Sequence, residues 1–196
     1  MSDPETLAVY AAQAEKYATL ATLDMERPHV ERFIAQMPKG ARVLDIGCGP
    51  GVVTGAFAAA GMEAEAWDPV PEMVAMAAAQ PGVTARQAVY ADLVAEGVYD
   101  GIWANFSMLH TSLADWPAQF AAVARALKPG GLFHFGTKLG EGEARDSIGR
   151  FYSYISEPAL MDLMAQTGLT VEYTRTGEGA GLSGEVAPFI SVQARA

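Results

Sequence analysis

The run VLDIGCGPG at residues 43–51 constrains the fold of this chain more than any other stretch. Its apolar residues Val43, Leu44 and Ile46 form the continuous pattern of a strand buried on both faces of a parallel sheet, and residues 52–60 then predict a helix. The glycines at alternate positions of the run carry no side chains and tolerate positive φ. The turn between strand and helix is therefore expected to fold tightly under a ligand bound against its backbone.

Charge narrows the identity of that ligand. A dinucleotide site has the spacing G-x-G-x-x-G and holds a pyrophosphate at the helix N-terminus. Here the spacing is G-x-G-x-G, and Val52 stands where the third glycine of a dinucleotide site belongs. Asp45, just before the turn, would repel a pyrophosphate and attract a cation. S-Adenosylmethionine carries a sulfonium, an ammonium and a ribose but no phosphate, so it fits these residues better.

A second acid follows the next predicted strand. Residues 63–67 predict that strand, and Asp68 stands at its end, 17 residues after Gly51. An ionised carboxylate offers two acceptor oxygens, so Asp68 can bind both hydroxyls of a ribose. It could instead cap the helix predicted for residues 71–80, and the two roles are compatible. Met73 in this helix could lay its thioether on an adenine or simply pack in the core.

Further landmarks follow in the same order of strand and acid. Residues 83–88 predict a third strand that leads to Asp92 and Leu93, and residues 99–104 predict a fourth. Together the landmarks resemble the class I S-adenosylmethionine-dependent methyltransferases over residues 41–138, and in particular the small-molecule, tellurite-resistance-type enzymes. The glycine turn resembles motif I of that family, Asp68 its motif II, and Asp92 with Leu93 its adenine-binding position. The resemblance implies these cofactor-binding residues: Tyr17, Asp45, Gly47, Cys48, Gly49, Asp68, Met73, Asp92, Leu93, Asn105 and Phe106.

The alternation of strands and helices predicts one α/β domain with parallel strands. The resemblance implies a Rossmann-like fold whose seven-stranded, mostly parallel sheet has the order 3-2-1-4-5-7-6, with helices on both faces. We expect residues 1–37 to form an N-terminal helical cap, with helices at 7–23 and 28–37, and residues 41–196 to form the core. After a fifth strand in residues 127–138, the pattern predicts a loop at 141–149, a helix at 157–167, a strand at 169–175, a flexible connector at 177–184 and a last strand at 188–194.

Composition and charge exclude several classes of protein. A chain of 196 residues with 51% hydrophobic and 18% charged residues can form a sizeable core and is not disordered. Its net charge of −10 disfavours nucleic acid as substrate and a membrane surface as partner. The first residues lack a signal-peptide pattern and Cys48 is the single cysteine, so a cytoplasmic protein without disulfides is expected. The histidines at 29, 110 and 134 show no metal-ligand spacing, so no metal is expected.

Methyl transfer from a sulfonium depends mainly on alignment of the acceptor with the sulfur–methyl bond. His110, after the fourth strand, is the candidate general base for an acceptor with a surplus proton, although it could merely pack or cap. The candidate substrate contacts are Lys138, Arg145, Arg150 and Tyr152, at or beyond the end of the fifth strand. We expect S-adenosyl-L-methionine as cofactor and a small molecule as substrate; a non-catalytic adenosylmethionine-binding module and, less favoured, a nicotinamide-dependent oxidoreductase are the alternatives. The sequence predicts neither the acceptor nor the oligomeric state.

Overall fold

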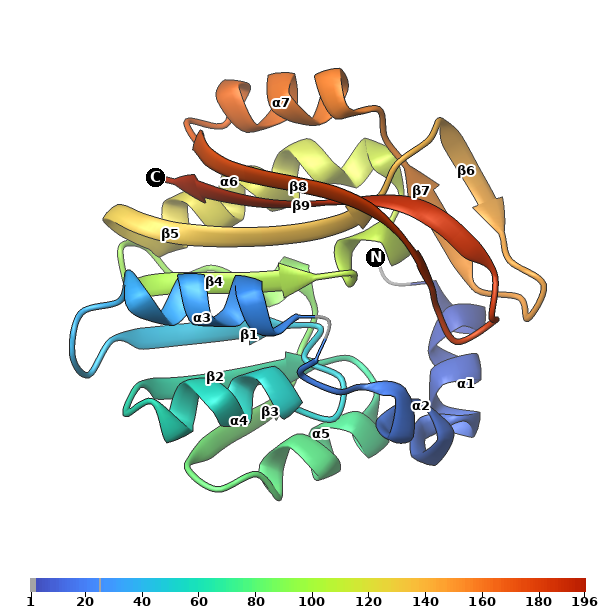
Figure 1. Cartoon of the computed structure of the whole chain (residues 1–196), viewed down its shortest axis with the longest axis horizontal. Coiled ribbons are helices and arrows are strands. Elements are labelled where there is room, and N and C mark those ends of the chain that lie inside the picture. Colours follow the sequence, from blue (N-terminus) through green and yellow to red (C-terminus); the bar gives the residue numbers. More distant parts are fainter. Residues whose placement is uncertain (1–2, 25) are drawn as a thin grey trace.

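The computed structural model describes residues 3–24 and 26–196, and its centre is a seven-stranded sheet (Figure 1). The strands stand in the order β3-β2-β1-β4-β5-β9-β8. Neighbours among β1 to β5 pair in parallel, whereas β9 runs antiparallel to both β5 and β8. The strand bounds are β1 Arg42–Ile46, β2 Glu63–Asp68, β3 Val83–Gln87, β4 Tyr99–Asn105, β5 Leu127–Lys138, β8 Thr170–Ala180 and β9 Val186–Arg195. The predicted strand order is confirmed, since β8 and β9 are the sixth and seventh strands of the sheet.

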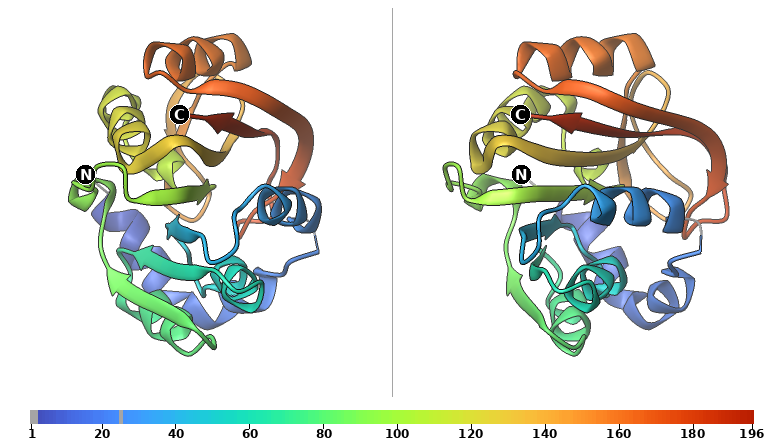
Figure 2. Two further views of the ribbon diagram at one scale, coloured as in Figure 1. Left: turned by 90° about the vertical axis from the view of Figure 1, so that its left-hand side faces the viewer. Right: turned by 60° about the vertical axis from the view of Figure 1, so that its left-hand side comes forward.

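Helices cover both faces of this sheet (Figure 2). On one face α3 (Arg27–Ala35), α4 (Val52–Ala59) and α5 (Pro71–Ala78) pack side by side. On the other face α6 (Trp116–Ala126) packs against α7 (Glu157–Gln166). The short helices α1 (Pro4–Ala12) and α2 (Ala14–Leu20) lie at the carboxyl ends of the parallel strands (Figure 1). Single 3-10 turns, η1 (Tyr90–Asp92), η2 (Met108–His110) and η3 (Leu113–Asp115), complete the connections.

The alternation of side chains along each strand decides which residues meet at the carboxyl edge. On the α6 and α7 face, Phe133 of β5 packs with Phe120 of α6 in the larger apolar cluster. On the opposite face, Trp103 of β4 packs edge-on with Phe33 of α3 and Phe57 of α4. The strand register places a group of polar residues on this same face as Trp103: Asp45, Asn105, His134 and Lys138. The polar group therefore lies under α3 and α4, near the edge where the parallel strands end.

The N-terminal segment differs from the single helix predicted for residues 7–23. It forms two helices, because Gln13 leaves the helical region with φ −116° and ψ 19°. The break brings the rings of Tyr10 and Tyr17 edge to face, with centroids 5.2 Å apart. Both tyrosines pack with Ala14 against Val70 and Met73 at the start of α5. Residues 1, 2 and 25 of the predicted cap lie outside the described residues.

Two predicted connections are wrong in part, because backbone pairing overrides local composition. The segment predicted as a loop at 141–149 contains β6 (Gly142–Arg145), which pairs antiparallel with β7 (Phe151–Tyr154). The connector predicted at 177–184 is shorter, since β8 continues to Ala180 by pairing with β9. A Cβ at Gly177 would lie 2.9 Å from the Phe189 ring, so the glycine makes room for this cross-strand aromatic side chain.

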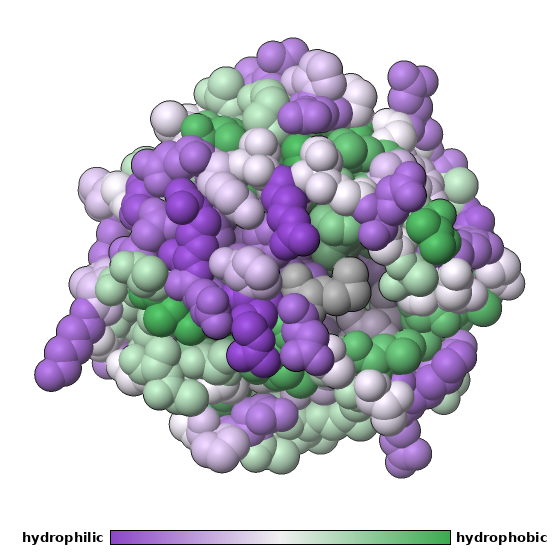
Figure 3. Space-filling model, viewed as in Figure 1, coloured by the Kyte–Doolittle hydropathy of each residue, from purple (hydrophilic) through white to green (hydrophobic). Residues whose placement is uncertain are grey.

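The surface drawn in Figure 3 is a mixture of hydrophilic and hydrophobic side chains. Over the described ranges, the exposed large hydrophobic residues are Leu20, Val94 and Val186. None of the helices within residues 3–24 and 26–196 combines the length and the apolar character that crossing a membrane requires.

Candidate functional site

The glycine turn between β1 and α4 has the strained backbone that the sequence predicts. Gly47, Gly49 and Gly51 have φ values of 74°, 53° and 76°, which side-chain-bearing residues rarely adopt. The turn also packs closely against Ser107, because a Cβ at Gly47 would lie 2.1 Å from the Cβ of that serine. The turn therefore needs glycine both for its conformation and for its contact with the segment after β4.

The backbone N–H groups of the turn are already satisfied inside the protein. The N–H groups of Gly47 and Cys48 donate to the carbonyl of Trp67, at 2.7 and 3.1 Å. The N–H of Gly49 donates to Oδ2 of Asp68, at 2.9 Å. A dinucleotide site instead points such N–H groups at a pyrophosphate. Here a carboxylate occupies one of them, so the turn does not suit a phosphate ligand.

Asp68 ends β2 beside this turn, and its carboxylate is held at both oxygens. Oδ1 accepts the N–H of Val70 at 2.9 Å, while Val70 itself is the N-cap residue of α5. Asp68 therefore stabilises the segment that leads into α5, although it is not the N-cap residue of that helix. Burial raises the pKa of Asp68 to about 6, against the lowering effect of the two N–H donors. The carboxylate lines a cavity and retains lone pairs for a further donor.

Asp45 is the second buried carboxylate of the site. It projects from β1 toward α4, where the Thr54 hydroxyl donates to Oδ2 at 2.6 Å. Burial raises the pKa of Asp45 to about 7; the Thr54 bond opposes this shift, and the charge of Asp68 adds to it. A nearby cation would favour the ionised form.

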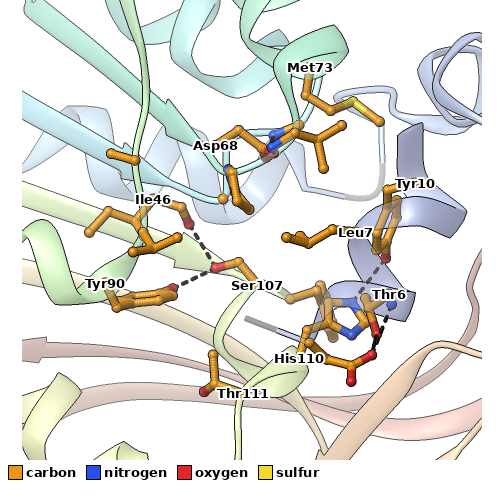
Figure 4. A pocket seen from close by; sticks show the side chains of 18 of the residues that line it. Thr6, Leu7, Tyr10, Ile46, Asp68, Met73, Tyr90, Ser107, His110 and Thr111 are labelled. Carbon is orange, nitrogen blue, oxygen red and sulfur yellow. Dashed lines mark hydrogen bonds between the residues drawn. The ribbon is translucent and has the colours of Figure 1, made fainter. Parts of the chain in front are cut away.

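Two cavities open at the carboxyl edge of the sheet. The smaller has a volume of about 80 Å³ and lies between Asp68 and Met73 on one side and Leu7 and Tyr10 of α1 on the other (Figure 4). The larger has a volume of about 630 Å³, within the range of small-molecule sites. Six residues line both cavities: Tyr10, Tyr17, Gly47, Asn105, Phe106 and His110. The two cavities therefore adjoin, and we call these six residues the junction.

The floor of the smaller cavity is fixed by a hydroxyl network that the sequence analysis missed. Ser107 donates to the carbonyl of Ile46 at 2.7 Å and, since its single proton is used there, accepts from the Tyr90 hydroxyl at 2.6 Å (Figure 4). Neither serine nor tyrosine in a loop carries a distinctive sequence signal. The network connects β1, η1 and the segment after β4.

The predicted adenine-binding position requires correction. Asp92 and Leu93 line neither cavity. The Asp92 carboxylate turns back onto its own segment and accepts the N–H of Val89 at 2.9 Å, while Leu93 is buried in the core. The cavity wall is formed by residues just upstream: Ala88, Val89 and Tyr90. The cause is the 3-10 turn η1, whose closure uses the carboxylate.

His110 lies at the junction with a defined tautomer. Its Nδ1 is 2.7 Å from the carbonyl oxygen of Phe151, so Nδ1 carries the proton. Nε2 is therefore an acceptor, and it lies 3.0 Å from the Tyr10 hydroxyl (Figure 4). That hydroxyl accepts from Nη1 of Arg150 at 2.8 Å and donates to His110. Burial lowers the pKa of His110 to about 4, and the Phe151 carbonyl opposes this shift.

The predicted substrate contacts fall into two groups. Lys138, Arg150 and Tyr152 line the larger cavity. Arg145 does not line either cavity and needs correction as a substrate contact, because its guanidinium pairs with Asp3 at 2.9 Å at the start of α1. This ion pair between the β6–β7 hairpin and the start of α1 depends on the fold, and no local sequence pattern indicates it.

The remaining predicted cofactor residues surround the two cavities. Met73 and Gly49 line the smaller cavity, Cys48 lines the larger, and Tyr17 lines both. Burial raises the pKa of the Cys48 thiol, which keeps the thiol protonated. Phe106 at the junction is the one non-glycine residue with positive φ in the described part of the chain, at 50°. Such backbone strain is typical of functional sites.

The fold and the site define the class of this protein. A sheet of order 3-2-1-4-5-7-6, a glycine turn after the first strand and Asp68 at the end of the second strand together define a class I S-adenosylmethionine-dependent methyltransferase. The sequence model of a protein family described as a methyltransferase domain matches residues 27–174. The chain belongs to this methyltransferase family.

Curated relatives match part of the chain. A ubiquinone biosynthesis O-methyltransferase of Xanthomonas axonopodis pv. citri (strain 306) is 36% identical over 107 residues, which cover 51% of this chain and 44% of the relative. A malonyl-[acyl-carrier protein] O-methyltransferase of Enterobacter lignolyticus (strain SCF1) is 32% identical over 121 residues, which cover 58% and 46%. The match thus spans less than half the length of either relative.

Solved structures match the whole fold. A Burkholderia thailandensis 1,6-didemethyltoxoflavin-N1-methyltransferase, with bound 1,6-didemethyltoxoflavin and S-adenosylhomocysteine, has a TM-score of 0.76 and 22% identity and covers 100% of this chain and 91% of its own. An S-adenosylmethionine-dependent methyltransferase from Methanosarcina mazei has a TM-score of 0.72 and 17% identity, with 86% and 96% covered. At these identities the likeness shows the fold.

Proposed function

We propose that the chain transfers the methyl group of S-adenosyl-L-methionine to a small-molecule acceptor and releases S-adenosylhomocysteine. The observation that carries this proposal is the junction, where the smaller, carboxylate-lined cavity meets the larger one at Tyr10 and His110. A cofactor along the smaller cavity and an acceptor in the larger would meet there. Membership of the methyltransferase family supports the same activity.

The residues around the smaller cavity fit the chemistry of this cofactor. Asp68 offers a buried carboxylate to ribose hydroxyls, and Met73 and Val89 offer an apolar wall to adenine. Asp45, which lines the adjoining larger cavity, offers a second carboxylate to an ammonium. When bound, the cofactor supplies a methyl group on a positively charged sulfur. The smaller cavity is below the roughly 300 Å³ of ordinary ligand pockets, so we propose that α1, which lines it through Leu7, moves outward during binding.

His110 is the proposed proton acceptor for acceptors that carry a surplus proton. Its Nε2 lone pair faces the junction and is occupied by the Tyr10 hydroxyl, which an acceptor hydroxyl would replace. The low pKa of His110, a result of its burial, makes it a weak base near neutral pH. An acceptor that arrives already ionised therefore suits this site better than one that must lose a proton there.

A non-catalytic adenosylmethionine-binding module is the second candidate function. It would retain Asp45 and Asp68 but would not need a second cavity open to an acceptor. The nicotinamide alternative is disfavoured, because the Gly49 N–H is hydrogen-bonded to the Asp68 carboxylate and Val52 replaces the third glycine of a dinucleotide site.

We also propose a single domain over residues 1–196, with the segment 1–37 as its cap. We propose a cytoplasmic location as well, which rests on the lone Cys48.

Calorimetry and labelling test the proposal together. S-Adenosylhomocysteine is expected to bind, and Asp68→Ala is expected to weaken binding at least tenfold, because the ribose loses a charged acceptor. Asp162→Ala on the exposed side of α7 is the matched control and should bind as the unchanged protein does. Incubation with methyl-labelled cofactor and a metabolite extract should yield a labelled small molecule. Binding without any labelled product would favour the module, and heat with NADH but not with S-adenosylhomocysteine would overturn the proposal.

A further inference from the structure

We propose that the methyl acceptor is a small organic acid with an apolar body, whose carboxylate is held by Lys138 in the larger cavity. This inference rests on the proposed function and narrows its substrate class. Lys138 is the last residue of β5 and lines the larger cavity. Its side chain lies over the Tyr152 ring, with Nζ 4.1 Å from the ring centroid.

Lys138 differs from Arg150, the other buried cation of this cavity, in forming no ion pair within the described residues. Arg150 forms an ion pair with Asp146 at 2.7 Å, and both side chains are almost fully buried. Arg175 is exposed, and its charge opposes the rise that burial causes in the pKa of the cavity carboxylate Glu26. Within residues 3–24 and 26–196, the aromatic face of Tyr152 is the contact of the Lys138 ammonium, without an ion pair or hydrogen bond.

An unpaired ammonium in such a place is unfavourable without a ligand. Lys138 is only 8% exposed. Burial lowers its pKa and the nearby charge of Arg150 acts in the same direction, whereas the more weakly acting charges of Asp146 and Glu185 oppose this shift. Buried charges in proteins are normally paired or hydrogen-bonded, and a cation–π contact recovers only part of the lost hydration. An anion that enters the cavity would supply the missing partner.

The location of Lys138 connects this anion site to the reaction. The Tyr152 ring under its ammonium is 4.6 Å from the His110 ring, measured between centroids, and His110 belongs to the junction. An acidic group held by Lys138 would thus lie within one aromatic ring of the point where cofactor and acceptor meet.

The other walls of the larger cavity indicate the body of the acid. Large apolar side chains form much of the lining: Trp103, Phe106, Leu109 and Phe189. Among the cavity carboxylates, Asp45 accepts from Thr54 and Glu26 from Asn105, while Oε2 of Glu26 is buried without a hydrogen-bond partner in the described structure. The cavity therefore offers apolar contact to most of a ligand, and to its acidic end it offers at Lys138 a buried ammonium without an ion pair.

Benzoate and its neutral isostere benzamide test the proposal on protein saturated with S-adenosylhomocysteine. We expect benzoate to bind about tenfold more tightly than benzamide, about 1.4 kcal/mol, and to raise the pKa of Lys138, followed by NMR of the lysine side chains. Lys138→Met, which keeps an unbranched side chain without the charge, should abolish the preference for benzoate, and Lys138→Arg should retain it. Lys39→Met, in the exposed turn before β1, is the matched control and should behave as the unchanged protein does.

Three outcomes would overturn the proposal: equal affinity for the acid and the amide, no response of Lys138 at tens of millimolar benzoate, or an unchanged preference in Lys138→Met. Thermal unfolding of Lys138→Met provides a second measurement that does not depend on a ligand. Loss of an unpaired buried charge should leave the melting temperature equal or higher, and a large decrease would show a structural role instead. Calorimetric titration with S-adenosylhomocysteine distinguishes failure of this inference from failure of the proposed function. Binding of S-adenosylhomocysteine without selectivity for benzoate would refute only this inference.

Discussion

Asp45 provides a stability prediction that follows directly from its burial. Asp45 is 3% exposed, and its carboxylate accepts a hydrogen bond from the Thr54 hydroxyl. Its folded-state pKa is about 7 against an ordinary value of 3.8. Because the folded form holds its proton more tightly than the unfolded form, the stability contributed by this group is full below pH 4 and is lost as the pH rises to about 7.

The size of the effect follows from the same two values. A difference of one pH unit between folded and unfolded pKa values corresponds to about 1.4 kcal/mol. The rise from 3.8 to about 7 therefore removes about 4 kcal/mol in total, of which about 2.5 kcal/mol falls between pH 5 and pH 8. Asp45→Asn has the same shape, can still accept from the Thr54 hydroxyl, and does not ionise. We expect the free energy of unfolding of the cofactor-free protein to fall by about 2.5 kcal/mol more than that of Asp45→Asn over this pH range.

Urea denaturation at pH 5 and pH 8 measures this double difference, in which the other titrating groups cancel. Asp162→Asn on the exposed side of α7 is the control and should follow the unchanged protein at both pH values. If the stability difference between Asp45→Asn and the unchanged protein is the same at pH 5 and pH 8, then Asp45 is ionised throughout and the reasoning from burial is wrong.

Three further measurements test the site. Tyr10→Phe should lower the free energy of unfolding by about 1–2 kcal/mol in urea, because a buried guanidinium loses its acceptor; an unchanged midpoint would contradict the hydrogen bonds at the junction. Gly40→Ala should cost about 1 kcal/mol of backbone strain, since its φ is +70° and a Cβ there has open space. Gly47→Ala, with φ +74° and a Cβ 2.1 Å from a serine side chain, should cost at least about 1–3 kcal/mol more, and equal losses would refute the close contact. The affinity for S-adenosylhomocysteine in calorimetry should fall from pH 8 to pH 5, because Asp68, with a pKa of about 6, becomes neutral; Asp68→Asn should flatten that dependence.

The strands around the glycine turn could be predicted from the sequence, because the sequence patterns that indicate them are local. The apolar run around Leu44 dictates a strand buried on both faces, and the glycines after it dictate a turn that other residues cannot adopt. Asp68 at the next strand end lies where the prediction puts it, beside the turn and hydrogen-bonded to it. Parallel pairing brings strand ends together at one edge of the sheet, so the order of strands along the chain was enough to place Asp68 beside the turn.

Contacts between residues, many of them far apart in the chain, decided which charged side chains remain available to a ligand. The sequence offers three equivalent candidates for a substrate contact: Lys138, Arg145 and Arg150. In the fold, Arg145 forms an ion pair with Asp3 and Arg150 forms one with Asp146, whereas Lys138 lies over an aromatic ring. Asp92 turned away from the cavity because its own 3-10 turn offered a closer N–H donor. Periodicity and residue type determine which elements form, whereas the availability of a side chain to a ligand depends on which other groups fold against it, and tertiary structure alone decides that.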